Sequence, residues 1–325
     1  MKLRTISIYA AIALAIGVTG TGVLYSMGVG TPFFAWNSET TMYTNDDKTI
    51  EAADITSIDL QFPAADIAFK RSEDAQIHVV LRSNLNDEQL GKRYDYTAEQ
   101  DGAKLAVKLE GKPSIFGFQN GNENIHIDIL LPKQTLDAVN VQYAAGDVKF
   151  ESLQAKQLRV DTSAGDIAIK DYQGSELEVS TKFGAVKLDT ITVDRTKVEI
   201  AAGSVKVNGL TGETFEAESS SGNLTLADVA AQVKARVSSG NAEVQMKELR
   251  HNLDISVTAG NVNLKVPKSA SFAYDLSAKA GNLKNNLSDS TTTSGEKRNQ
   301  SGTIGSGGPE VRVSTMAGNI TVSAE

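Results

Sequence analysis

The chain has 325 residues, with 32 basic and 40 acidic side chains and no cysteine. The lack of cysteine excludes disulfides, thiolate metal sites and a lipid-modified cysteine, so any membrane tether would have to consist of apolar residues. A formal net charge of −8 argues against nucleic-acid partners, because an acidic surface repels phosphates.

The first predicted element is a membrane anchor at residues 1–30. Residues 6–30 contain no charged side chain, and a run of about 20 apolar residues is enough to cross a bilayer. Lys2 and Arg4 before this run and Asp46 after it predict a single-pass helix in the cell membrane, with a cytoplasmic N-terminus and an extracellular C-terminal domain. A cleaved signal peptide is the alternative, because the most apolar half of the run also has the length of a signal-peptide core.

Residues 31–56 are expected to form a linker, and residues 57–133 a β cap with irregular first coils. Alternating apolar residues predict strands at 58–62, 67–69, 77–81, 105–109 and 125–131, and the pair Asp101-Gly102 predicts a hairpin. A cap is expected because the open end of a repeat array exposes its apolar interior and its unpaired backbone groups.

A repeat occupies residues 134–325. Each unit centres on a glycine, and most of these glycines follow Ala or Ser and precede Asp or Asn; they are Gly146, Gly165, Gly184, Gly203, Gly222, Gly240, Gly260, Gly281 and Gly318. Apolar residues alternate with polar ones on both sides of each glycine, which predicts two strands per unit with one buried face each. A spacing near 19 residues predicts an all-β fold, a single-stranded parallel β-helix (solenoid) with one coil per unit and a right-handed winding.

Two-residue hairpin turns are the competing interpretation, since Gly-Asx pairs also suit them. The position six residues before each glycine argues for stacking, because its charge alternates from unit to unit through Arg159, Glu178, Lys197, Glu216, Lys234 and Asp254. Equivalent residues about 4.8 Å apart in parallel register would then face opposite charges above and below.

The last unit follows a gap of 37 residues between Gly281 and Gly318. Residues 286–309 are rich in Ser, Thr, Gly and Asn, so we expect one coil that carries a mobile loop there. The final coil has no obvious cap, which motivates a self-assembling structural solenoid as one possible function.

No catalytic, cofactor-binding or metal-binding residue is assigned. His78, His126 and His251 have no spacing that would bring them to one site, so we expect them to be surface or strand residues. Asp147 and Asp166 follow their glycines as in calcium-binding repeats, but neutral residues continue the same position in the next units, which favours a stacked turn column.

A carbohydrate-active enzyme, either a polysaccharide lyase or a hydrolase, is the main alternative to a binding protein. Its candidate residues are the charged positions expected on the outer faces of the coils, namely Asp161, Glu199, Glu218 and Arg236 with Lys149, Lys187 and Lys206. Two carboxylates at a suitable separation can hydrolyse a glycosidic bond. A solvated face with paired charges explains the same residues, and we favour that explanation.

The recurring [Ala/Ser]-Gly-[Asp/Asn]-[Val/Ile/Leu] motifs, with Ile129-Leu130-Leu131-Pro132 before the array and Gly307-Gly308-Pro309 before the last coil, resemble a bacterial family. This is the "putative adhesin" β-solenoid family of membrane-anchored, LiaG-like proteins. The resemblance covers residue 55 to the end and implies an extracytoplasmic, membrane-tethered protein without known catalytic residues. Gly184-Ala185 and Asn285 depart from the pattern.

These features together predict a binding or scaffold protein that is not an enzyme. Its expected partners are the membrane, through the N-terminal helix, and a cell-envelope polymer or an envelope-stress signalling protein. The expected role is adhesin-like, as an accessory in cell-envelope maintenance or stress response.

Overall fold

A computed structural model describes residues 42–112, 123–287, 291–296 and 298–325. The predicted anchor at residues 1–30 and the first part of the predicted linker lie outside the described residues. Within the described residues, no helix has the length and apolar character needed to cross a bilayer. Residues Met42–Glu325 form one compact unit made almost entirely of strands.

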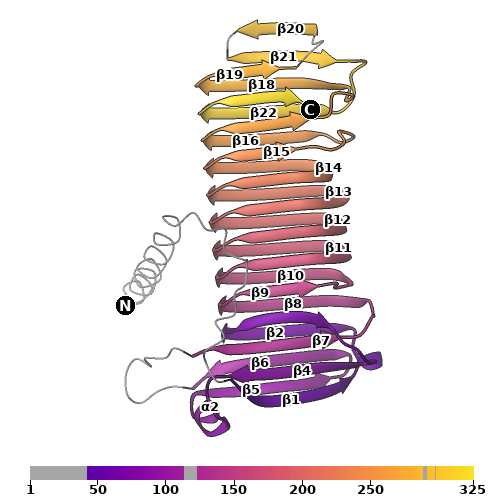
Figure 1. Ribbon diagram of the computed structural model, residues 1–325, viewed down its shortest axis with the longest axis vertical. Coiled ribbons are helices and arrows are strands. Elements are labelled where there is room, and N and C mark those ends of the chain that lie inside the picture. Colours follow the sequence, from indigo (N-terminus) through magenta and orange to yellow (C-terminus); the bar gives the residue numbers. More distant parts are fainter. Residues whose placement is uncertain (1–41, 113–122, 288–290, 297) are drawn as a thin grey trace. The chain divides into compact units, whose positions relative to one another are not determined.

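The middle of this unit is a regular stack of parallel coils (Figure 1). It consists of β8 (Leu136–Ala145), β9 (Val148–Glu151), β10 (Ala155–Ala164), β11 (Ile167–Phe183), β12 (Val186–Ala202), β13 (Val205–Ser221), β14 (Leu224–Ser239) and β15 (Ala242–Gln245). Arg159 faces Glu178, and Glu178 faces Lys197, in parallel register. The predicted parallel solenoid is therefore confirmed, and the hairpin interpretation is wrong.

The apolar core runs through the stack as columns of equivalent residues. Five residues before each glycine, for example, the side chains are at most 3% exposed in five successive coils, at Val160, Val179, Val198, Ala217 and Ala235. Because every coil buries the same positions against its neighbours, each coil is stabilised by the coils on both sides of it.

The repeated glycines form a column in which backbone packs on backbone. All nine have positive φ angles, between 120° and 149°. A Cβ atom on Gly203 would lie 1.8 Å from the carbonyl oxygen of Gly184 in the preceding coil. Only glycine therefore allows the coils to stack this closely at the corner.

The residue after each glycine links neighbouring coils through its side chain. The Asp147 carboxylate accepts a hydrogen bond of 2.8 Å from the backbone N–H of Asp166, and Asn223 accepts one of 3.0 Å from Asn241. The column begins at Asp66, whose carboxylate accepts from the N–H of Asp147. These contacts agree with the stacked turn column expected from the sequence.

A second corner lies six residues after the glycine, and here non-glycine residues adopt the left-handed conformation. Thr190 has φ 57°, whereas the equivalent residue of the next coil is Gly209 with φ 71°. A β-branched residue is strained at such an angle by roughly 1–2 kcal/mol. We expect Thr190→Gly to raise the unfolding free energy by about 0.5–1 kcal/mol, because the entropy lost by glycine offsets part of the relief. Gly209→Thr should lower the unfolding free energy. Denaturant titration measures both variants, and two changes of the same sign would contradict the proposed strain at this corner.

At the N-terminal end the coils are not stacked in chain order. The elements are β1 (Tyr43–Glu51), a 3-10 turn (Ala52–Asp54), β2 (Ser57–Ala64), β3 (Asp66–Arg71), β4 (Gln76–Ser83), α2 (Asp87–Arg93), β5 (Tyr94–Asp101), β6 (Lys104–Gly111) and β7 (Ile125–Leu131). The coil formed by β2 and β3 lies between β6 and β7 on one side and β8 and β9 on the other, all in parallel. Antiparallel β5, and β4 with β1 beyond it, cover the outer side.

Part of the predicted linker is a strand. Residues 43–51 form β1 and pair with β4, although they contain Asp46, Asp47 and Lys48. Charges and a register shift between Thr44 and Asp46 are typical of an edge strand that is protected against pairing with other chains. The sequence analysis assigned these residues to the linker, but they form the outermost strand.

The C-terminal end also departs from chain order. Its strands are β16 (Leu253–Ala259), β17 (Val262–Val266), β18 (Phe272–Ala280), β19 (Leu283–Asn286), β20 (Thr291–Glu296), β21 (Asn299–Ile304), β22 (Glu310–Ala317) and β23 (Ile320–Ala324). The last coil, β22 and β23, lies between the β16–β17 coil and the β18–β19 coil. Figure 1 shows the yellow strands of this coil below β18 and β19.

Two expectations at this end are wrong. The predicted loop at 286–309 contains β20 and β21, an antiparallel hairpin that pairs with β18. The final coil is also internal and has a neighbour on each side. The reason given for end-to-end assembly, an uncapped last coil, therefore no longer holds.

Candidate binding groove

A groove runs along the coils on the side formed by β2, β6, β8 and β10 to β14, just before the glycine corner. It consists of two neighbouring hollows of about 660 Å³ and 450 Å³ that share Ser180 and Lys182. The first hollow extends from Gln61 and Glu110 to Lys182, and the second from Ser180 to Ser238. The groove thus follows the stacking direction over many coils.

The groove exists because small side chains occupy the position two residues before each glycine. In successive coils this position holds Ala144, Ser163, Lys182, Ala201, Ser220 and Ser238. Longer side chains four residues before the glycine, such as Glu199, Glu218 and Arg236, form one wall. The result is an open channel with a mixed lining, in which hydroxyl and charged groups lie beside apolar side chains such as Phe62 and Tyr143.

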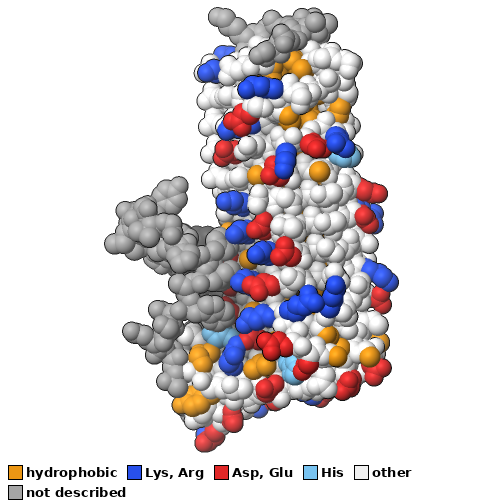
Figure 2. Space-filling view, turned by 45° about the vertical axis from the view of Figure 1, so that its right-hand side comes forward, with side chains coloured by type: hydrophobic (Ala, Val, Ile, Leu, Met, Phe, Trp, Pro, Cys, Tyr) orange, Lys and Arg blue, Asp and Glu red, His pale blue; other side chains and the backbone are white. Residues whose placement is uncertain are grey.

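The charged groups along the wall contact partners. Asp161 lies 2.7 Å from Nε of Arg159, and the Glu199 carboxylate lies 2.7 Å from Nζ of Lys197. The Glu218 carboxylate lies 3.2 Å from Nη1 of Arg236. Figure 2 shows basic and acidic side chains beside one another along the coils on the face in view.

These contacts bear on the three carboxylates of the enzyme alternative. Glu199 and Glu218 face each other on neighbouring strands, roughly 4.8 Å apart at the backbone, and both line the second hollow. Glycoside hydrolysis needs one carboxyl held in its protonated form as an acid. The positions fit the separation of such a pair. Each of these carboxylates is, however, engaged in an ion pair with a neighbouring cation.

The three lysines of the enzyme alternative lie on another side of the coil than the groove. Lys149 sits on β9, Lys187 on β12 and Lys206 on β13, all after the glycine corner. They form one column in which Lys187 faces Lys206. None of the three lines either hollow of the groove.

The irregular unit at Gly184 contributes a long side chain to the groove. Among the coils that line the groove, Lys182 is the only long side chain two positions before the glycine, whereas Lys279 and Met316 hold this position in coils outside it. Phe183 is 42% exposed and faces Ala164 and Ala202 on the neighbouring strands. The exposed aromatic ring thus has small residues on both sides, but it lines neither hollow of the groove.

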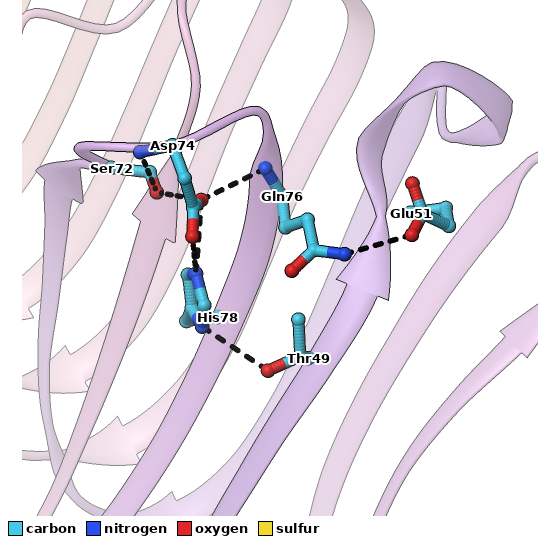
Figure 3. Close-up of polar contacts among 6 residues, drawn as sticks. All are labelled: Thr49, Glu51, Ser72, Asp74, Gln76 and His78. Carbon is cyan, nitrogen blue, oxygen red and sulfur yellow. Dashed lines mark hydrogen bonds and ion pairs between the residues drawn. The ribbon is translucent and has the colours of Figure 1, made fainter.

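A separate polar network surrounds His78 on the outer strands β1 and β4 (Figure 3). Its Nε2 lies 2.9 Å from the Asp74 carboxylate, and its Nδ1 lies 3.3 Å from the Thr49 hydroxyl. The backbone N–H of Gln76, the Ser72 hydroxyl and His78 lower the pKa of Asp74 to about 2. Carboxylate, imidazole and hydroxyl follow the order of a nucleophilic triad, but the Asp74 side chain is 53% exposed and these residues line neither hollow. The network joins β1 to the turn between β3 and β4.

A buried carboxylate lies on the face formed by β3, β4 and β7. Asp128 is 4% exposed and contacts Lys70 at 2.8 Å and Arg82. Burial, followed by the charge of Arg82, lowers the pKa of Lys70. His126 lies 3.4 Å from Asp66, and burial lowers its pKa. Two cations compensate the buried charge of Asp128, so the cluster serves to hold these three strands together.

The histidines do not meet. His78 lies on β4 and faces Leu130 of β7, whereas His126 lies on β7 and faces Arg82 of β4. His251 is exposed beyond β15. Among the described residues, no group of three or more His, Asp or Glu side chains is arranged to hold a metal ion.

The sequence analysis missed both the groove and the His78 network. A signal for the groove was present, because small residues recur two positions before the glycines and Lys182 breaks that pattern. The Asp74 and His78 pair is spaced by four residues, but the contact to Thr49 depends on the pairing of β1 with β4, which no local pattern indicated.

Comparison with known proteins shows the following. A sequence model described as Toastrack DUF4097 matches residues 55–323. A search of curated proteins finds no match. Solved structures that match this chain include one described as a putative adhesin from Bacteroides fragilis, with 14% identity and a TM-score of 0.44 over 88% of this chain and 98% of that one. A putative adhesin from Parabacteroides distasonis matches with 12% identity and a TM-score of 0.39, over 88% of this chain and 98% of that one. A putative lipid binding protein from the same species matches with 14% identity and a TM-score of 0.37, over 86% of this chain and 94% of that one.

Proposed function

Since the chain belongs to the Toastrack DUF4097 family, we propose that it is a binding or scaffold protein that holds an extended polymer of the cell envelope in the groove along its coils. The observation that carries this proposal is the groove itself, whose two hollows of about 660 Å³ and 450 Å³ follow one another along the stack. A site for a small molecule is usually a single concave, mostly apolar pocket. An open channel of mixed polar and apolar lining fits a linear chain that contacts one coil after another.

The wider setting of the proposal comes from the sequence. We propose an adhesin-like protein tethered to the cell membrane by residues 1–30, with its solenoid outside the cell, as an accessory in envelope maintenance or stress response. The right-handed winding and the likeness to LiaG-like proteins belong to this proposal. So does the absence of enzymatic activity, which is supported by the ion pairs that the carboxylates of the groove wall form with neighbouring cations.

The proposal is tested by blocking the groove. Ser220 is exposed at its floor, so Ser220→Trp should fill the channel without disturbing the core. We expect the full chain to be retained by purified cell-wall material and the Ser220→Trp variant to lose at least about tenfold in affinity, because the bulky ring excludes the polymer. Thr211→Trp is the matched control, since Thr211 is also exposed but lies outside both hollows. Equal retention of both variants, or indifference of the wild-type chain to every envelope fraction, would count against the groove as the binding site.

A further inference from the structure

We propose that the groove selects an uncharged, hydroxyl-rich polymer, a neutral glycan, and that Arg159 and Lys197 set this selectivity by neutralising the carboxylates of the groove wall. This inference rests on the proposed function and names the chemical class of the polymer. It follows from the charges in and beside the groove, which balance although the chain as a whole has a net charge of −8.

The acidic side chains of the groove are matched by cations. Four acidic and two basic side chains line the two hollows, namely Glu110, Asp161, Glu199 and Glu218 against Lys182 and Arg236. Arg159 lines neither hollow, but its Nε lies 2.7 Å from the Asp161 carboxylate. Lys197 also lies outside them, with its Nζ 2.7 Å from the Glu199 carboxylate. With these two cations included, four positive charges stand against four negative ones.

The two cations outside the hollows act on several carboxylates of the wall. The hydrogen bond and charge of Asp161 raise the pKa of Arg159, and the charge of Glu199 contributes to the effect. The hydrogen bond and charge of Glu199 raise the pKa of Lys197, with a further contribution from Glu218. Removing either cation would therefore leave negative charge in the wall without compensation.

A compensated wall favours a ligand without charge. A charged group on the ligand would lose water and meet carboxylates that are already paired, which costs free energy. An ionised carboxylate accepts about four hydrogen bonds, so Glu199 and Glu218 can still accept from hydroxyl groups while they contact their cations. Lys182 and Glu110, which form no ion pair with another described residue, have opposite signs and give the groove no overall charge preference.

The mixed lining suits a sugar chain. A pyranose ring carries C–H groups on its faces and hydroxyls at its edge, so it uses apolar and polar contacts at the same time. Phe62 and Tyr143 belong to the apolar part of the lining, and Ser163, Ser180 and Ser220 supply hydroxyls along the channel. An uncharged glycan thus finds both kinds of contact without disturbing the ion pairs.

The salt dependence of retention on purified cell-wall material tests the charge of the bound polymer. Because an uncharged glycan neutralises no charge on binding, we expect the retention of the full chain to change less than about twofold between low and high salt. Retention that Ser220→Trp blocks, but that falls steeply as salt is added, would overturn the inference and leave the groove as the binding site. Retention that Ser220→Trp does not affect would contradict the proposed function, and the inference with it.

A cationic probe tests the role of Lys197. The probe is a glucosamine tetramer, and its fully N-acetylated form is the uncharged reference. Binding to the full chain is measured by calorimetry in mildly acidic buffer at about 0.15 M salt, where distant charges are screened. We expect the wild-type chain to bind the acetylated form at least as tightly as the amine. Lys197→Gln should shift the ratio of the two affinities by about twofold to fivefold towards the amine, as expected for a carboxylate released from an exposed ion pair.

Lys206→Gln is the matched control, because it removes the same charge from β13 but outside both hollows. It should leave the ratio unchanged, whereas Arg159→Gln should act like Lys197→Gln by releasing Asp161. No shift in Lys197→Gln, an equal shift in Lys206→Gln, or a wild-type preference for the amine would overturn the inference. If neither probe binds, the assignment to a glycan fails, and retention on cell-wall material decides the proposed function separately.

Discussion

Replacing Gly203 by alanine is expected to lower the unfolding free energy by more than about 3 kcal/mol, a loss in the range of severe core mutations. The added Cβ would lie 1.8 Å from the carbonyl oxygen of Gly184 and 2.9 Å from the Ile200 side chain. Backbone atoms cannot turn away as a flexible side chain can, so the two coils would have to separate at this corner. The residue also has φ 148°, which alanine adopts only with strain.

The effect should extend beyond one coil, because Gly222 packs on Gly203 in the same way that Gly203 packs on Gly184. Thermal and denaturant unfolding of Gly203→Ala would measure it. Gly91→Ala is the matched control, since Gly91 lies in α2 with no heavy atom within 4 Å of the added Cβ. That variant should gain about 0.5–1 kcal/mol from helix propensity. A Gly203→Ala protein as stable as the wild type would mean that the glycine column does not set the distance between coils.

The regular part of the fold could be predicted from the sequence because a repeat shows the same local requirement many times. The corner needs a glycine, the next position an Asx residue, and the flanking strands alternate, so nine weak signals reinforced one another. Charge alternation at Arg159, Glu178 and Lys197 then distinguished parallel stacking from hairpins. The structure places these residues in register, and Arg159 contacts Glu178 at 3.0 Å.

The ends could not be predicted in the same way, because they depend on which coil lies next to which. In chain order Asp254 would be followed by Asp275, and two acids would face each other. In the structure Arg312 of the final coil lies between them and restores the alternation. The sequence therefore contained a sign of the inserted coil, but one that is visible only when the columns are compared out of chain order. The hairpin of β20 and β21 was hidden for another reason, since its Ser, Thr and Gly content is also that of loops.

The groove could be predicted from the sequence only in part. Small residues recur two positions before most of the glycines, but a hollow forms only where longer side chains flank them. Phe183 and Lys182 were visible as an irregularity in the Gly184 unit. The exposure of Phe183, and the position of Lys182 at the junction of the two hollows, required the structure.

Deleting residues 310–325 is expected to unfold the C-terminal end of the solenoid while the coils from 136 to 245 remain folded. The deleted coil buries Val311, Val313, Ile320 and Val322 to 1% exposure or less. At about 1.5–3 kcal/mol each, these side chains contribute up to roughly 6–12 kcal/mol of burial, shared with the coils on both sides. Strand β18 would lose its parallel neighbour β22, and the backbone N–H of Gly318 would no longer donate to Ala280.

The remaining chain could escape this loss only if the β18–β19 coil moved onto the β16–β17 coil, as its spacing along the chain would allow. Asp275 would then lie beside Asp254, and like charges facing each other destabilise such a pairing by a few tenths of a kcal/mol to about 1 kcal/mol. Hydrogen exchange read by mass spectrometry should therefore show loss of protection over residues 272–286 and 299–304 in the truncated chain, and unchanged protection over β10 to β14. Arg312→Asp, which keeps the coil but places three acids in one column, should weaken protection at the same end, and Arg312→Lys should not. Full protection of residues 272–286 after the deletion would show that neighbouring coils close the gap and that the inserted coil is not needed to hold the end together.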